Sequence, residues 1–171
     1  MTGTVYSQRV TQTINDGWKF SLFEGDASTA DFDISGWTDV SIPHTWNAKD
    51  ADDEIPGYFR GKGWYRKVVT VEELIPEQRV YLSFEGANQE TNVFVNGTFV
   101  GNHKGGYSAF TFDVTDYVHA GRNLIAVSVD NSHHPDIAPL SADFTFFGGI
   151  YRDVYLVYTS PVQLSTTHYA S

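Results

Sequence analysis

Cysteine is absent from this sequence of 171 residues. The chain therefore forms no disulfide bond and offers no thiolate for catalysis or metal binding, and cysteine usage says nothing about its redox compartment. Long apolar runs are missing as well, so no segment is long enough to cross a bilayer as a helix. The N-terminus also lacks the basic stretch and apolar run that are typical of a signal peptide.

Basic residues are scarce. Eleven Lys and Arg stand against 21 Asp and Glu, which gives a net charge of −10 with His neutral. Nucleic acids and anionic membranes select for clustered positive charge, so we expect neither as a partner. Hydrophobic residues make up 41% of the chain and aromatic residues 15%, too much for a disordered protein. The length is that of one domain with a substantial core.

Apolar and polar side chains alternate along much of the chain, which predicts β-strands. The predicted strands span residues 17–22, 64–71, 78–84, 108–112, 123–129 and 153–158. Residues 92–100 form a predicted hairpin, because Asn96-Gly97 suits a type I′ turn between flanking β-formers. One short helical turn is expected within residues 113–121, with Thr115 or Asp116 as its N-cap and Gly121 as its stop.

Many short strands without a helical period favour an all-β fold. We expect a two-sheet antiparallel β-sandwich of the jelly-roll type, with most aromatic side chains packed between the sheets. Two long segments, residues 41–65 and 130–153, are not strand-like throughout. Long connections in a compact domain are often functional, so these segments are the expected location of a site.

The usual catalytic motifs do not occur in this sequence. There is no Gly-x-Ser-x-Gly elbow and no phosphate-binding glycine motif in a strand-to-helix context. His133-His134 with Asp136 is interpreted as a polar loop, with a metal site as the alternative, because adjacent residues of an extended segment point apart. The acidic run of Asp50, Asp52, Asp53 and Glu54 is interpreted as a solvated face, since spacing alone defines no catalytic carboxylate pair.

Short motifs in a fixed order give the chain a family resemblance over residues 14 to 160. They are Pro43-His44-Thr45-Trp46-Asn47, residues 58–67, Phe84-Glu85-Gly86-Ala87, Val93-Phe94-Val95-Asn96-Gly97, Gly105-Gly106-Tyr107, Phe110-Thr111-Phe112-Asp113, Gly121-Arg122-Asn123-Leu124, Val129-Asp130-Asn131-Ser132 and residues 148–154. The ordered set resembles the N-terminal domain of glycoside hydrolase family 2, which comprises β-galactosidases, β-glucuronidases and β-mannosidases.

The resemblance implies a division of the chain and a set of partners. Residues 1–160 would be a jelly-roll sugar-binding domain, and residues 161–171 a linker and the start of an immunoglobulin-like domain. A (β/α)₈ barrel, which takes about 250 residues, would follow and carry the two glutamates of a retaining mechanism. The implied partners are a β-linked saccharide, the immunoglobulin-like and barrel domains of the same chain, and further copies in a homo-oligomer. No cofactor is required, and a cation in the full-length enzyme is left open.

The resemblance also implies two substrate-binding residues and no catalytic or metal-binding residue within this chain. Asp143 aligns with a carboxylate that binds substrate hydroxyls, since an ionised Asp accepts from two of them; its alternative role is a turn cap. Arg60 falls near a position whose side chain enters the same pocket, with pairing to Asp52 or Asp53 as the alternative. His44 and Trp46 are interpreted as structural.

The function predicted from the sequence is that of a non-catalytic domain of a retaining exo-β-glycosidase, inactive alone. The motifs look closest to β-galactosidase-like members, while the choice among galactose, glucuronate and mannose depends on barrel residues. The alternatives are an autonomous carbohydrate-binding module and a structural sandwich at an oligomer interface. The resemblance leaves bacterial cytoplasm and periplasm both open.

Overall fold

The computed structural model describes residues 9–50, 57–138 and 146–160. This part of the chain folds into ten strands and one short 3₁₀ helix. They are β1 (Val10–Thr13), β2 (Trp18–Leu22), β3 (Thr38–Val40), β4 (Lys62–Val71), β5 (Arg79–Phe84), β6 (Glu90–Val95), β7 (Thr98–Lys104), β8 (Phe110–Asp113), η1 (Thr115–Tyr117), β9 (Gly121–Asp130) and β10 (Val154–Thr159).

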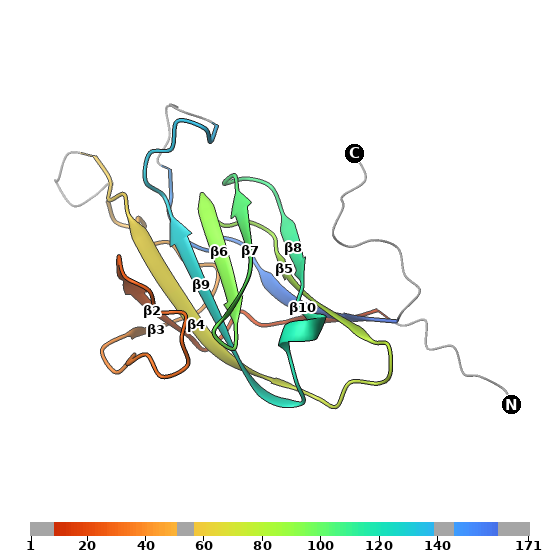
Figure 1. The fold of residues 1–171 in the computed structure, drawn as a ribbon. Coiled ribbons are helices and arrows are strands. Elements are labelled where there is room, and N and C mark those ends of the chain that lie inside the picture. The colour runs from red at the N-terminus through yellow and green to blue at the C-terminus, as the bar shows by residue number, and fades with distance from the viewer. Residues whose placement is uncertain (1–8, 51–56, 139–145, 161–171) are drawn as a thin grey trace, which may run out of the picture.

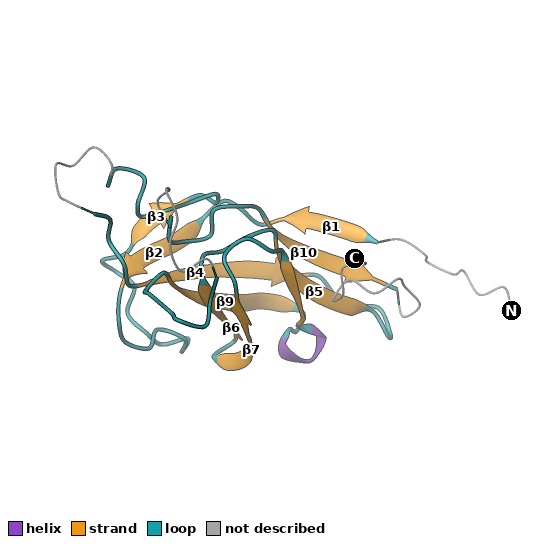
Figure 2. Ribbon diagram, turned by 90° about the horizontal axis from the view of Figure 1, so that it is seen from above, coloured by secondary structure: helices purple, strands orange, loops and turns teal. Residues whose placement is uncertain are grey.

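The strands form two antiparallel sheets that face each other (Figures 1 and 2). One sheet has four strands in the order β1-β10-β5-β8, and the other has six in the order β3-β2-β4-β9-β6-β7. The jelly-roll sandwich predicted from the sequence is thereby confirmed. Among the described residues, no helix is long and apolar enough to span a membrane.

Most strand predictions hold within a few residues, and the exceptions share a cause. The hairpin prediction is confirmed, because Asn96 and Gly97 have positive φ angles of 52° and 81° and join β6 to β7. Strands β1 and β3 were not predicted. Both are short edge strands, and neither contains a buried residue that would produce an alternating pattern.

The helical turn lies where it was expected, but its predicted caps are wrong. Val114 stands at the N-cap of η1 and makes no side-chain cap hydrogen bond. The amide of Thr115 instead donates to Oδ1 of Asp113, at 3.0 Å. Gly121 does not stop the helix, because η1 has already ended before Val118 and Gly121 opens β9. A polar side chain before the turn therefore accepts the hydrogen bond that was expected of a residue inside it.

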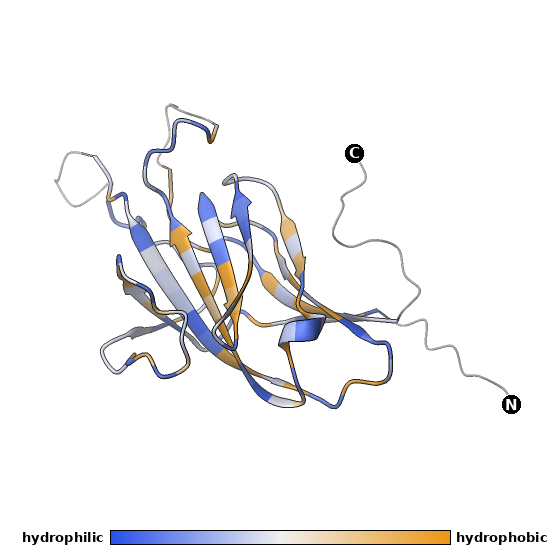
Figure 3. Ribbon diagram, in the orientation of Figure 1, coloured by the Kyte–Doolittle hydropathy of each residue, from blue (hydrophilic) through white to orange (hydrophobic). Residues whose placement is uncertain are grey.

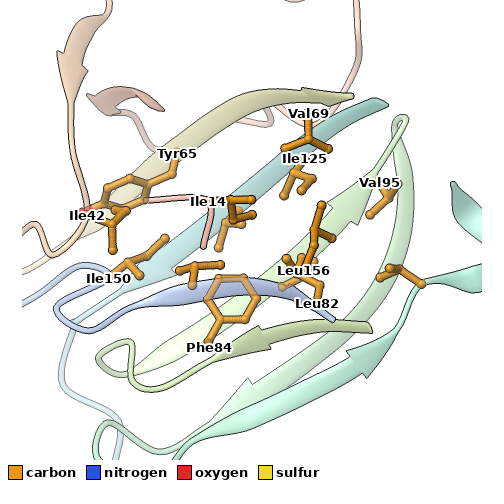
Figure 4. Close-up of a cluster of buried hydrophobic side chains, with 14 of the residues drawn as sticks. Ile14, Ile42, Tyr65, Val69, Leu82, Phe84, Val95, Ile125, Ile150 and Leu156 are labelled. Carbon is orange, nitrogen blue, oxygen red and sulfur yellow. The ribbon is translucent and has the colours of Figure 1, made fainter. Parts of the chain in front are cut away.

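The core lies between the two sheets (Figure 4). Its largest fully buried side chains include Trp18 and Tyr65 from the six-stranded sheet and Phe84 and Leu82 from the four-stranded sheet. Apolar residues recur along the strands, whereas η1 is hydrophilic (Figure 3). Two core residues, Ile42 and Ile150, come from the long loops rather than from strands. Their burial anchors both loops to the sandwich.

Candidate functional site

Four loops meet at one end of the sandwich. β4 and β6 begin there and β9 ends there, because Lys62 and Glu90 both pair with Asp130. In an antiparallel sandwich this places the described residues 44–50, 57–61, 85–89, 105–109, 131–138 and 146–153 at the same end, which is the upper end in Figure 1. Both segments that were expected to carry function contribute to this loop cluster.

Asn131 is the centre of the loop cluster and is 1% exposed. Its Oδ1 accepts a hydrogen bond from the amide of Gly61 at 2.9 Å. Its Nδ2 donates to the carbonyl oxygens of Phe59 at 3.2 Å and Phe146 at 3.1 Å. The side-chain amide of Asn131 therefore forms hydrogen bonds with backbone groups of both long loops. These backbone groups lie outside the strands, so they need a partner other than a strand ladder.

A second buried amide, that of Asn47, completes this connection. Its Oδ1 accepts from the amide of Gly148 at 2.6 Å and from Nδ2 of Asn131 at 3.2 Å. Its Nδ2 donates to Oδ2 of Asp50 at 2.7 Å. The same Asp50 oxygen accepts from the amide of Phe59 at 2.7 Å. Asp50 is thus a partly buried structural acceptor in the loop, so its interpretation as part of a solvated face is wrong.

His44 and Trp46 both pack against the base of the loop cluster. Nδ1 of His44 lies 2.8 Å from the hydroxyl of Tyr65, and its ring packs against Phe20 at 4.6 Å. The ring of Trp46 stacks on Phe20 at 5.8 Å. A Cβ on Gly148 would come within 2.1 Å of the Trp46 ring, so the loop backbone lies directly on the indole. These contacts agree with the structural roles expected for both residues.

Burial lowers the pKa of His44 and, at the other side of the loop cluster, that of His103. The His44 imidazole therefore binds a proton less readily in the folded protein than in the unfolded chain, where its pKa is near 6.5. The unfolded state then binds more protons, so the free energy of unfolding should fall as the pH drops below about 6.5.

We expect this fall to be smaller in His44→Gln, because the substituted side chain does not titrate. The measurement is the pH dependence of thermal unfolding between about pH 7.5 and 5. The exposed His119 serves as the control. If His119→Gln flattens the curve as much as His44→Gln does, burial of His44 is not the cause.

Arg60, one of the two expected substrate-binding residues, lies exposed on the loop cluster. Its guanidinium carbon lies 4.8 Å from the ring centre of Tyr58 and 5.1 Å from that of Phe146. The guanidinium also donates to the Tyr58 hydroxyl and, at 3.5 Å, to the carbonyl oxygen of Asn131. Within the described ranges no carboxylate forms an ion pair with Arg60.

The other expected substrate-binding residue, Asp143, lies outside the described residues. Asp52 and Asp53, the alternative partners of Arg60, lie outside them too, as does Glu54. The structure therefore brings together Arg60, the two amide side chains and the long loops, and it tests neither the role of Asp143 nor the alternative ion pair.

In the segment with His133 and His134, one histidine contacts a glutamate side chain. Nε2 of His134 lies 3.1 Å from Oε2 of Glu90, at the start of β6. In the part of the chain that the structure describes, no three His, Asp or Glu side chains gather in a way that could hold a metal ion.

The four tryptophans offer no exposed platform for a sugar ring. Trp18 and Trp64 are buried, while Trp37 and Trp46 are partly buried. Three other aromatic side chains of the loop cluster are about half exposed, namely Phe59, Tyr107 and Phe147, at 46%, 46% and 45%. An aromatic contact at this end of the domain would therefore use phenylalanine or tyrosine.

Sequence reasoning did not assign roles to Asn47 and Asn131, nor to Tyr58 and Phe146 beside Arg60. Both asparagines stand within the motifs that carry the family resemblance, but an asparagine in a loop is typical of any turn. Only their burial and the convergence of both loops distinguish them. An asparagine two residues after a predicted strand, as at position 131, is the one signal that was available.

The two sheets and the loop cluster define an all-β sandwich domain with long loops at one end. The sequence matches the family described as "Glycosyl hydrolases family 2, sugar binding domain" over residues 11–161. The chain therefore belongs to glycoside hydrolase family 2, as the N-terminal domain of its glycosidases.

Relatives of known name carry two activities. The chain is 38% identical to a β-glucuronidase of Bacteroides fragilis, over 98% of this chain and 23% of the relative. It is also 38% identical to a β-galactosidase of Thermoanaerobacter pseudethanolicus, over 94% of this chain and 21% of the relative. The crystal structure of a Bacteroides uniformis β-glucuronidase has a TM-score of 0.83 and 46% identity, over 90% of this chain and 18% of that one.

The chain spans about a fifth of the length of these relatives. The family expectation from the sequence is confirmed, and the β-galactosidase expectation is confirmed only as far as a glycosidase of this family, because both names occur among the relatives.

Proposed function

We propose that this chain is the non-catalytic sugar-binding domain of a retaining exo-β-glycosidase whose substrates are β-D-glucuronides. Residues 1–160 form the domain, and residues 161–171 lead into an immunoglobulin-like domain that precedes a catalytic barrel. The relatives named β-glucuronidase support the choice of sugar. The observation that carries it is the exposed, stacked guanidinium of Arg60 on the loop cluster.

Arg60 has the chemistry that a glucuronide requires. A guanidinium is planar and always charged, and it binds a carboxylate through two parallel hydrogen bonds. The rings of Tyr58 and Phe146 restrict this side chain to one region of the loop cluster. Less entropy is lost when a restricted side chain binds, which strengthens the contact. In a chain of net charge −10, an exposed cation here selects for an acidic sugar.

Asp143 is the second proposed contact, to the sugar hydroxyls. This role rests on the resemblance of the segment before Gly148 to the family and on the ability of a carboxylate to accept from two hydroxyls. The proposed reaction needs two further carboxyl groups about 5–5.5 Å apart. These belong to the barrel, so the 171-residue chain should hydrolyse nothing alone.

β-Galactosides are the second candidate substrates, as the relative from T. pseudethanolicus supports. Here Arg60 would donate to neutral hydroxyls instead of a carboxylate. Charge distinguishes the two candidates, because only the glucuronide offers an anionic partner to the guanidinium.

The experiment is an assay of the parent enzyme, expressed from the complete gene, on 4-nitrophenyl β-D-glucuronide, β-D-galactoside and β-D-mannoside. We expect kcat/KM to be highest for the glucuronide, and the 171-residue chain alone to release no nitrophenol. A parent enzyme that prefers the galactoside would establish the second candidate. A parent without activity on any of the three, or saccharide binding by the chain alone that Arg60→Ala leaves intact, would contradict both.

Arg60→Ala in the parent enzyme should lower kcat/KM for the glucuronide about 10- to 100-fold, the effect of losing a charged hydrogen bond. Activity on the galactoside should change much less, because no carboxylate is lost from the contact. Arg122→Ala is the matched control, an exposed arginine at the far end of β9. Equal losses on both sugars would mean that Arg60 does not recognise the carboxylate.

A further inference from the structure

A hollow of about 620 Å³ opens between the two sheets at the end opposite the loop cluster. β4 begins at Lys62 in the loop cluster and ends at Val71, immediately before the hollow's Glu72 and Glu73. β1 and β10 form the facing wall. The hollow is therefore separated from the proposed sugar contacts by the ten-residue length of β4.

Strands β1 and β10 of the four-stranded sheet contribute Val10, Gln12 and Tyr158 to the wall of the hollow. Val10 of β1 pairs with Tyr158 of β10, and Gln12 pairs with Leu156, so all four side chains point to one side of the sheet. That side is the core side, because Leu156 is 1% exposed within the core. Val10 nevertheless remains 51% exposed. A valine that faces the core and stays half exposed lacks the partner that would cover it.

The segment between β4 and β5 adds a second exposed apolar side chain to the hollow. Ile75 also lines the hollow and is 49% exposed, while its neighbour Leu74 packs against the core. The carboxylates of Glu72 and Glu73 lie along the same wall. Burial and, to a lesser degree, the charge of Glu72 raise the pKa of Tyr158. The hollow thus combines exposed apolar surface with two negative charges.

We propose that this hollow is the docking site for the domain that follows β10 in the parent enzyme, and that this domain fills it with an apolar side chain next to a lysine or arginine. The inference rests on the longer parent chain proposed above. Relatives of this chain are about four to five times as long as the aligned part, so further chain is available to dock here. An apolar group covers Val10 and Ile75, and the cation pairs with Glu72 and Glu73.

The position of β10 favours this occupant over any other protein. β10 ends at Thr159, one residue after Tyr158 in the wall of the hollow. The chain that continues from there starts beside the hollow, and three or four extended residues already cover about 10–14 Å. Attachment at this point gives the following domain a high effective concentration at the hollow, whereas a separate protein must bind from solution.

The test measures amide hydrogen exchange in the parent enzyme. Ile75→Glu should speed exchange of the amides in residues 72–78, and of those that follow Ser160, at least about tenfold, because it removes the covering contact. Val68→Glu is the matched control, since Val68 is 47% exposed but points away from the layer between the sheets, beside Leu124. Amides of β6 and β9 report whether each variant remains folded, and Ile75→Thr provides a milder change.

Each outcome decides the inference. Unchanged exchange in Ile75→Glu, or an equal change in Val68→Glu, would overturn it. Slowed exchange that depends on protein concentration would assign the hollow to a second copy and overturn it as well. The double variant Glu72→Lys and Glu73→Lys should speed exchange in the same segments, and no change there would refute the basic partner residue. Exchange is measured without substrate, so the result is independent of which glycoside the parent hydrolyses.

Discussion

Gly149→Ala is expected to lower the free energy of unfolding by about 3 to 5 kcal/mol, the sum of backbone strain and overpacking. Gly149 has a φ angle of +118°, which a residue with a Cβ rarely adopts. A Cβ here would also lie 2.5 Å from the Tyr65 hydroxyl and 2.6 Å from the carbonyl oxygen of His44. Two backbone hydrogen bonds with Asn88 also oppose a shift of Gly149, because the amide of each residue donates to the carbonyl oxygen of the other, at 3.0 and 3.3 Å.

Two other glycines separate strain from crowding. Gly121 has a φ angle of +93°, but no atom lies within 4 Å of the place that a Cβ would take, so Gly121→Ala should cost only the strain, about 1 to 2 kcal/mol. Gly36 has neither feature, and Gly36→Ala should change stability by less than about 0.5 kcal/mol. Denaturant unfolding of the 171-residue chain measures all three. A Gly149→Ala cost no larger than that of Gly121→Ala would show that the contacts with Tyr65 and His44 are not tight.

Asn131→Ala is expected to cost roughly 3 kcal/mol or more, since each buried polar group left without a partner costs about 1 to 3 kcal/mol. The substitution removes the acceptor of the Gly61 amide and the donor to Phe146, whereas the carbonyl oxygen of Phe59 keeps its hydrogen bond from Nδ2 of Asn47 at 2.9 Å. Denaturant unfolding measures the loss. Hydrogen exchange should also show faster exchange at residues 59–61, because these residues lose their link to the opposite loop.

Asn102→Ala is the control for this prediction. Asn102 also donates two hydrogen bonds, to Glu90 at 3.1 Å and to Asn92 at 2.9 Å, but it lies exposed on β7. Water replaces those bonds, so we expect a loss below about 0.5 kcal/mol. Equal losses for Asn102→Ala and Asn131→Ala would mean that the number of hydrogen bonds matters and burial does not.

The strands were largely predictable because their signal is local. Trp64 to Val71 alternates between core and outer face, and Asn96-Gly97 forms a turn that needs only its own backbone preferences. β1 and β3 were not predictable in this way, because an edge strand with exposed side chains is held by the neighbouring strand alone. The same reason explains the caps of η1, where Asp113, outside the helix, supplies the acceptor.

The candidate site was predictable in position but not in construction. Two long, aromatic-rich loops indicated where a site was expected, and Arg60 is exposed in the cluster that they form. The residues that hold these loops together, Asn47 and Asn131, lie 84 positions apart and meet only when the chain is folded. The sequence likewise held no sign of the hollow beside Val10, because exposure depends on what the opposite sheet leaves uncovered.

The sequence alone determined the strands, the β-hairpin and the membership of a glycosidase family. Alternation, turn preference and ordered motifs are all properties of neighbouring residues, so they can be recognised without the fold. Only the tertiary structure decided which asparagines are buried, how Arg60 lies against the rings of Tyr58 and Phe146, and where the sandwich stays open. Those features depend on contacts between distant segments. Burial of an amide costs free energy unless the amide is hydrogen-bonded, whereas a polar loop residue in solvent can bind water instead.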